Sequence, residues 1–281
     1  MYGTKLCLGL SEQFGIDDLQ QIRLLREIGF EAFFSGWHPG ADIGALRRAA
    51  DAEGMVFQSI HAPFVKMADM WEPTDETQAA VDELIACLRD CADSGVPIMV
   101  AHAFIGFTSH NPTAFGLKNF ERVVAEAERL GVKVALENTE GEEYLAALMT
   151  HFAGCNAVGF CWDTGHEMCY NHSQDMLALY GDRLLCTHLN DNLGIRDFGG
   201  NITFIDDLHL LPFDGIADWA DIASRLNRCG FDGILTFELN TKSKPNRCEN
   251  DPYGRMDIRQ YFTQAYMRAC RVAALKARRR G

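Results

Sequence analysis

The sequence predicts a single (β/α)8 barrel, and three observations lead to this prediction. Short apolar runs alternate eight times with longer segments of helical periodicity along the 281 residues, which is the pattern of parallel βα units. A barrel of this kind commonly takes about 250 residues in one domain. No Pro/Ser-rich linker divides the chain, and neither GxGxxG nor GxxxxGK[ST] marks the phosphate loop of an open nucleotide-binding sheet. We therefore expect one barrel domain over residues 1–281.

The short apolar runs are the expected strands, and each is followed by an expected helix. The strands are Lys5–Leu10, Ala32–Trp37, Val56–Ala62, Ile98–Ala103, Lys133–Thr139, Val158–Asp163, Leu184–Asn190 and Gly233–Asn240. The helices lie near residues 17–29, 42–53, 76–94, 114–130, 142–151, 174–182, 217–229 and 257–278. Several of these helices end in Gly just before the next strand, as at Gly29, Gly54 and Gly131, where glycine is the preferred C-terminal cap.

Composition and charge restrict the partners of the protein. The net charge of -13 disfavours broad nucleic-acid binding, which needs a basic footprint. The chain contains no run of about 18 apolar residues that would span a membrane, and it opens without a secretory signal. The ten cysteines form no CxxC pair and fit reduced thiols. We expect a cytoplasmic protein that binds a small molecule, without a membrane or nucleic-acid partner, and a homo-oligomer remains open.

The candidate site residues lie at the ends of the expected strands. Active sites of (β/α)8 barrels are built at the C-terminal ends of the strands, and six consecutive strands here end in His, Asp or Glu. These residues are His61, His102, Glu137, Asp163, His188 and Glu238. One such carboxylate is often only a helix cap or an ion-pair partner, but several converging without a cation would repel one another strongly. A mixed set of imidazoles and carboxylates suits Zn²⁺ or Mn²⁺, while Co²⁺ and Mg²⁺ stay open.

At these residues the sequence resembles the xylose isomerase-like TIM-barrel superfamily. The matching segments are LENTEG (136–141), WDTGH (162–166), HLNDN (188–192), DLHLLPFDGIADW (207–219) and FELN (237–240). The superfamily includes sugar-phosphate isomerases and epimerases, ketose 3-epimerases, inosose dehydratases and type IV apurinic endonucleases. In the epimerase branch four residues bind one divalent metal, and they correspond here to Glu137, Asp163, His188 and Glu238.

The resemblance also implies a reaction. Glu137 and Glu238 are the acid/base pair of the epimerase branch, and strands 5 and 8 carry them to roughly opposite sides of the barrel mouth. One carboxylate would remove a proton next to the substrate carbonyl, the metal would stabilise the enediolate, and the other carboxylate would return a proton. His166 would contact a substrate oxygen. Glu143 lies where the family often has a substrate-binding Glu, although a first-turn helix carboxylate explains it as well.

The endonuclease branch is the main alternative. Residues of this sequence also match the ligands of its three-metal zinc cluster. His61 and His102 match one metal set, and His166, Asp207 and His209 match another. In a single-metal enzyme, His61, His102 and His209 would instead bind substrate. The first and third loops, SEQFGIDD and KMADMWEPTDE, lean acidic, whereas an enzyme acting on DNA needs cations there.

Only one loop at the expected barrel mouth is basic. It follows strand 8 and carries Lys242, Lys244 and Arg247, so it could hold a sugar phosphate or be an ordinary solvated loop. The sequence thus predicts a metal-dependent isomerase or epimerase acting on a sugar, polyol or sugar phosphate. An endonuclease IV-like phosphodiesterase and an inosose-dehydratase-like lyase, which would share the enolate-type intermediate, are the alternatives.

Overall fold

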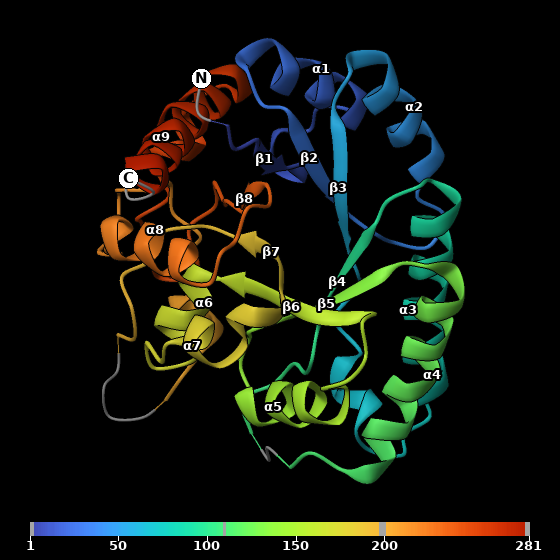
Figure 1. Cartoon of the computed structure of the whole chain (residues 1–281). Helices are drawn as coiled ribbons and strands as arrows, with labels where there is room; N and C mark the ends of the chain where they lie inside the picture. Colours follow the sequence, from blue (N-terminus) through green and yellow to red (C-terminus); the bar gives the residue numbers. More distant parts are fainter. Residues whose placement is uncertain (1–2, 109–110, 197–200, 279–281) are drawn as a thin grey trace.

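Eight parallel strands form the centre of the molecule, and helices surround them (Figure 1). The computed structural model describes residues 3–108, 111–196 and 201–278. The strands are β1 (Leu6–Gly9), β2 (Ala32–Gly36), β3 (Val56–His61), β4 (Ile98–His102), β5 (Lys133–Glu137), β6 (Val158–Asp163), β7 (Leu184–His188) and β8 (Leu235–Phe237). The predicted (β/α)8 barrel is confirmed, and each expected strand is present.

The strands follow one another in chain order around the sheet, and β8 pairs with β1. The last join, between β7 and β8, is looser than the others. It consists of a single bridge from Leu189 to Phe237 and of the Thr187 hydroxyl, which accepts the Thr236 N–H at 3.1 Å. The barrel is therefore nearly closed, with a side chain standing in for part of the ladder between β7 and β8.

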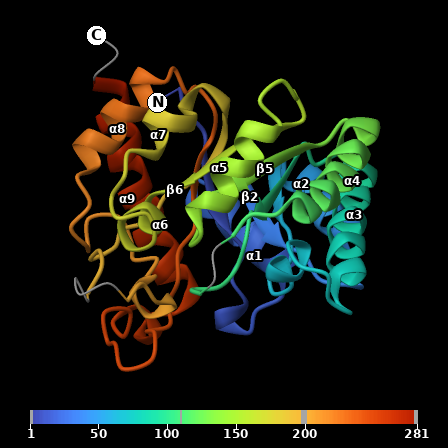
Figure 2. The same cartoon turned by 90° about the horizontal axis from the view of Figure 1, so that it is seen from below.

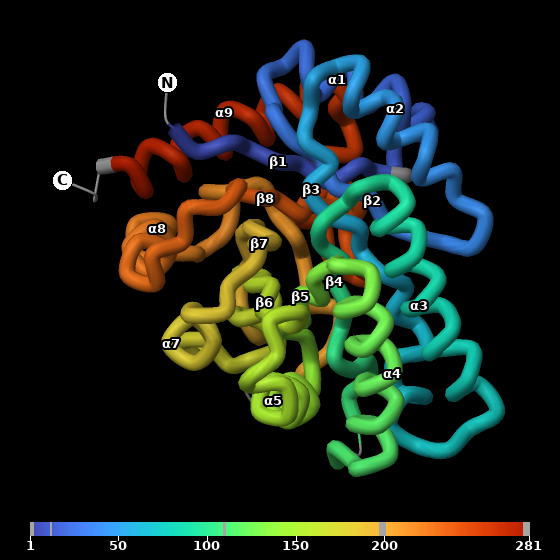
Figure 3. Tube along the Cα trace, turned by 45° about the vertical axis from the view of Figure 1, so that its right-hand side comes forward, coloured from blue at the N-terminus to red at the C-terminus, as the bar shows by residue number. Residues whose placement is uncertain are grey.

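The outer layer is a ring of helices (Figures 1 and 2). It contains α1 (Asp18–Ile28), α2 (Ile43–Glu53), α3 (Thr77–Asp93), α4 (Ala114–Leu130), α5 (Glu142–His151), α6 (Thr164–Cys169), α7 (Met176–Tyr180), α8 (Trp219–Arg228) and α9 (Ile258–Arg278). The long α9 packs against α8, α1 and β1, so the last helix covers the first strand (Figure 3). No helix in the described part of the chain is both long and apolar enough to cross a membrane.

Side-chain caps begin several of these helices at the barrel mouth. Asp17, Asp42 and Asp163 each accept a backbone N–H from the first turn of α1, α2 and α6, which satisfies a donor that the helix leaves unpaired. The helix α6 was not predicted, because it starts directly after β6 without an intervening loop. Its Asp163 cap turns the chain into a helix at once and holds His166 within the first turn.

The strand β8 is shorter than predicted, since it ends at Phe237 and the expected strand continued to Asn240. Beyond Phe237 the backbone binds other partners: the Asn240 N–H donates to the carbonyl of His209, and the Asn240 side chain accepts from Gln13 at 2.5 Å. The backbone N–H of Thr241 also donates to Gln13. The loops after β1 and β8 are thereby tied together around Glu238.

Candidate metal centre and active site

Four predicted ligands meet at the C-terminal ends of the strands. Glu137, Asp163 and His188 are the last residues of β5, β6 and β7, and Glu238 follows β8 directly. One ligand atom from each of the four lies within 4.8 Å of the others. All except Glu238 are fully buried, and the Glu238 side chain is 26% exposed. The group therefore has one open side, as a catalytic metal site requires.

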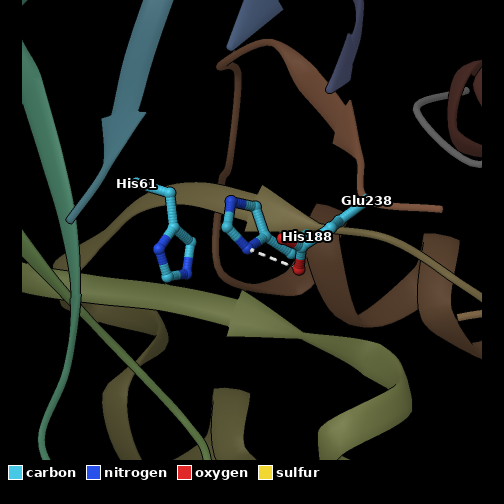
Figure 4. A group of neighbouring side chains, drawn as sticks. All are labelled: His61, His188 and Glu238. Carbon is cyan, nitrogen blue, oxygen red and sulfur yellow. Dashed lines mark ion pairs between the residues drawn. The ribbon is translucent and has the colours of Figure 1, made fainter. Parts of the chain in front are cut away.

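His188 lies at the centre of this group. Its Nδ1 is 2.8 Å from Oε1 of Glu137 and 3.2 Å from Oε2 of Glu238. Figure 4 shows the His188 ring between His61 and Glu238. Burial alone would lower the pKa of His188, but the charges of Glu238 and Glu137 raise it well above its ordinary value. Two carboxylates thus point at one nitrogen, and a cation at that point offsets their repulsion.

The same arrangement shifts the pKa values of the two glutamates. Burial acts to raise the pKa of Glu238, but the attraction of His188 outweighs it and holds the pKa at about 2. Burial also opposes ionisation of Glu137, yet His188, His102 and His61 keep its pKa well below the usual range. Both glutamates are consequently anionic at neutral pH and available as ligands or as proton acceptors.

Asp163 is held by amides from two neighbouring strands. Its Oδ2 accepts from the Asn190 side chain at 2.8 Å, and its backbone N–H donates to Asn138 at 2.8 Å. Burial raises the pKa of Asp163 to about 6. A Cβ on Gly165 would lie 2.0 Å from Oδ1 of Asn190, so only glycine leaves room for this amide. Asn138, Asn190 and Gly165 are positioning residues that the sequence analysis did not single out, although they belong to the LENTEG, HLNDN and WDTGH segments.

His61 and His102 lie beside Glu137. Their Nε2 atoms are 3.2 and 3.4 Å from its Oε2, and His61, His102 and Glu137 form a second group able to hold a metal. Burial lowers the pKa of His102, whereas the pKa of His61 is raised because Glu137 outweighs the effect of burial. Phe64 stacks on His102 with ring centroids 4.6 Å apart, and this aromatic neighbour was not predicted.

His166, Asp207 and His209 form a third cluster. Nε2 of His209 is 2.8 Å from Oδ1 of Asp207, and Nε2 of His166 is 3.4 Å from the same oxygen. Burial opposes a charge on His209, but Asp207 raises its pKa to about 9. The backbone of His209 has φ 48°, an uncommon conformation for a residue other than glycine. The hydrogen bond from Asn240 to its carbonyl at 2.9 Å helps to hold it there.

Three of these histidines are oriented in the same way. Nδ1 of His61, His166 and His209 lies 2.8, 3.0 and 3.1 Å from the backbone carbonyls of Ala62, Asn138 and Glu238. A neutral ring that donates from Nδ1 presents a lone pair at Nε2, and each Nε2 faces a carboxylate. Two electron-rich atoms face one another favourably only with a proton or a metal between them. This arrangement is the outer-shell pattern typical of metal-binding histidines, so the donor set fits a divalent cation.

The basic loop after β8 is partly neutralised. Nζ of Lys244 is 3.1 Å from Asp207, and Arg247 pairs with Asp206 at 2.7 Å and with Glu249 at 2.8 Å. Lys242 is exposed at the edge of the cavity. Two of the three cations predicted as a phosphate site therefore already have carboxylate partners.

Glu143 lies apart from the other predicted site residues. It is exposed in the first turn of α5, and the large cavity at the barrel mouth is lined by other residues of the described chain. A carboxylate in the first turn of a helix is favoured by the helix dipole. Its predicted contact with substrate stays a prediction.

Comparison with known proteins agrees with the barrel fold. The family model described as "Xylose isomerase-like TIM barrel" matches residues 22–257. "Uncharacterized protein y4fM" of Sinorhizobium fredii is 33% identical over 259 residues, covering 76% of this chain and 78% of that protein.

Two solved structures are similar in fold. D-psicose 3-epimerase from Clostridium cellulolyticum H10, solved with D-tagatose, has a TM-score of 0.74 at 15% identity, with 97% of this chain and 99% of that chain covered. The IolI protein, solved with a bound zinc atom, has a TM-score of 0.73 at 17% identity, with 96% and 98% covered. Both the matched family model and the barrel architecture lead to one assignment: the chain belongs to the xylose isomerase-like TIM-barrel family.

Proposed function

We propose that this protein is a divalent-metal-dependent isomerase or epimerase of a sugar or polyol. The observation that carries the proposal is the pair of glutamates, Glu137 and Glu238, which converge on one His188 nitrogen from β5 and from the end of β8. A protein that only bound a metal or a sugar would not need a second carboxylate on the other side of the bound molecule. The epimerase named among the similar structures supports a sugar substrate.

In this proposal the four ligands Glu137, Asp163, His188 and Glu238 hold the metal. Zinc is favoured by the mixed nitrogen and oxygen donors and by the zinc in the similar IolI structure, and manganese is the alternative. When bound, the metal supplies Lewis-acid stabilisation of negative charge on the substrate oxygens.

The chain's own groups transfer the proton. One of the two glutamates accepts the proton next to the substrate carbonyl, and the other returns a proton from the opposite side. The low pKa of Glu238, about 2, keeps it ionised and ready to accept. His166 and His209, whose Nε2 atoms face Asp207, would bind substrate oxygens. His61 and His102 would line the other side of the substrate.

Deuterium exchange tests this function. The purified protein, loaded with Zn²⁺ or Mn²⁺, is incubated in D₂O with ketoses, inososes and their phosphates, and exchange next to the carbonyl is followed by NMR. We expect exchange with wild-type protein and its loss in Glu137→Gln and Glu238→Gln. Metal content, measured for each variant, separates loss of proton transfer from loss of the cation.

The matched control is Glu121→Gln, an exposed glutamate on α4 whose partner is His151. Wild-type exchange is expected in this control. Absence of exchange with every carbonyl substrate in the fully loaded wild-type protein would contradict the proposal. Release of water from an inosose together with exchange would identify a lyase that uses the same residues.

A second candidate function is a phosphodiesterase with a multinuclear zinc site. It is favoured by His61, whose Nε2 faces the central Glu137 from outside the group, and by His166 and His209, whose Nε2 atoms face Asp207. These histidines could hold two further cations. The acidic loops at the mouth disfavour it. Metal analysis distinguishes the two: one ion per chain fits the isomerase, whereas three ions with nicking of abasic DNA would favour the phosphodiesterase.

A further inference from the structure

A large cavity begins at the candidate metal centre and extends away from it. Its volume is about 880 Å³, and His61, His209 and Glu238 line its inner end. From there it runs over the loops that follow β1 and β2, where Ser11, Gln13, Asp17, Asp18, Trp37 and Asp42 line it. Those loops lead into α1 and α2, in the outer ring of helices.

The cavity is larger than one sugar. A hexose has twelve non-hydrogen atoms, and if each took as much space as a water molecule in the liquid, about 30 Å³, the sugar would fill at most about 360 Å³. More than half of the 880 Å³ would then remain beside a single sugar unit at the metal centre. The remaining volume lies over the β1 and β2 loops.

The lining of this outer part suits hydroxyl groups and an apolar sugar face. Asp17 and Asp42 are exposed carboxylates. Trp37 is 9% exposed, so only part of its ring reaches the cavity lining, and its Nε1 is fixed by a 2.6 Å hydrogen bond to Asp90. Carboxylates accept hydrogen bonds from hydroxyls, and an aromatic side chain covers C–H groups. Aromatic and carboxylate side chains together are able to bind an uncharged polyhydroxyl group.

A phosphate fits this outer part poorly. Among the described residues that line the cavity, lysines occur only on the β8 loop, at Lys242 and Lys244, and Lys244 is paired with Asp207. The described residues that line the part over the β1 and β2 loops include carboxylates and neither lysine nor arginine. Arg48, outside the lining, lies 3.7 Å from Asp42, so a phosphate there would meet mainly like charge.

We infer that the substrate carries a second, uncharged sugar unit: the reacting unit binds at the metal centre and the second unit binds over the loops after β1 and β2. This inference rests on the proposed isomerase or epimerase function. The substrate class is then a disaccharide or other glycosylated ketose rather than a free or phosphorylated monosaccharide.

Matched substrates test the inference. A free ketose, its phosphate, and a disaccharide with the same ketose as its reducing unit are compared by deuterium exchange in D₂O. We expect kcat/KM for the disaccharide to exceed that for the free ketose by about tenfold or more, because contacts remote from the reacting carbon lower the barrier. An equal or higher value for the free ketose or its phosphate would overturn the inference and leave the proposed function intact. No exchange with any of the three would overturn both.

Two variants fill the outer part of the cavity. A Cβ on Gly36, at the end of β2, would meet open space, and Gly36 lines the cavity, so Gly36→Trp introduces a large ring there from an open position. Ala45→Trp introduces a ring into the cavity lining from the first turn of α2. We expect each variant to lower kcat/KM for the disaccharide about tenfold or more, with the value for the free ketose within about twofold of wild type.

The matched control is Gly154→Trp, at an exposed glycine before β6 whose Cβ position is also open. Circular dichroism checks that all three variants fold. Equal loss of both substrates in Ala45→Trp, or no loss of the disaccharide in either cavity variant, would contradict a second sugar site.

Discussion

Nδ1 of His188 lies 2.8 Å from Oε1 of Glu137, and both side chains are fully buried. A buried carboxylate costs several kcal/mol unless a cation or hydrogen-bond donor compensates it. The contact joins the ends of β5 and β7, and the same nitrogen also faces Glu238. His188 is therefore the residue on which the candidate metal centre depends most.

Replacing His188 should remove most metal binding. In His188→Gln the central nitrogen ligand is lost, and we expect the affinity for Zn²⁺ to fall by more than the ~10–100-fold typical of a lost supporting residue. Competition with a chromophoric chelator measures this affinity. The control is His151→Gln, on the surface of α5, and wild-type affinity is expected there. Unchanged affinity in His188→Gln would refute the assigned ligand set.

Metal binding should release protons and strengthen as pH rises. Because Glu238 and Glu137 raise the pKa of His188 well above its ordinary value, its Nδ1 carries a proton near pH 7, and a metal must displace it. We expect release of about one proton per ion. Below the Asp163 pKa of about 6, a second proton competes, so the affinity should fall more steeply. Calorimetry in PIPES and Tris buffers counts the protons, and a pH-independent affinity between pH 5.5 and 8 would contradict this assignment.

A single methyl group beside Asn190 should weaken the site. In Gly165→Ala the new Cβ would lie 2.0 Å from Oδ1 of Asn190, which must move and release Asp163 from its 2.8 Å hydrogen bond. We expect Zn²⁺ affinity to fall about 10–100-fold, as for other lost supporting contacts. Gly154→Ala, at an open position, should bind like wild type, and equal affinities in the two variants would disprove the steric argument.

Stability should depend on an ion pair away from the site. Arg225 binds Glu167 through two hydrogen bonds of 2.6 and 2.7 Å, and its guanidinium lies 4.7 Å from the Trp162 ring. Arg225→Leu leaves the carboxylate of Glu167 buried without this partner, so we expect the free energy of unfolding to fall by about 3–5 kcal/mol.

Arg129→Leu is the control for that variant. Arg129 is 63% exposed and pairs with Glu126 on the surface, where solvent screening leaves an ion pair little effect on stability. Urea unfolding of both variants gives the comparison. Similar losses in the two would show that burial of the Arg225 pair adds little.

Periodicity and strand-end chemistry were enough to predict the barrel and to bring together Glu137, Asp163, His188 and Glu238. This succeeded because parallel strands place their C-terminal ends at one rim whatever the intervening loops do. The early end of β8 was not predictable in the same way, since it depends on Gln13, more than 200 residues earlier in the chain.

The surroundings of the ligands were harder to predict than the ligands. The role of Asn190 depends on the space left by Gly165 in the preceding helix α6, and the stacking of Phe64 on His102 depends on a loop conformation. Both are contacts between separate segments of the chain. The periodicity of a sequence gives no information about such contacts. The predicted phosphate loop shows the same limit, because the charges of its Lys244 and Arg247 are countered by Asp207 and Asp206 from another segment.

The loose join between β7 and β8 lies directly beneath His188 and Glu238. Around most of the barrel, continuous ladders hold neighbouring strands together, whereas here one bridge and one threonine hydroxyl do so. Amide hydrogens along this join should exchange with solvent sooner than those of β5 and β6. A cation bound by both His188 and Glu238 would link the ends of β7 and β8. The same ion would then complete both the candidate metal centre and the wall of the barrel.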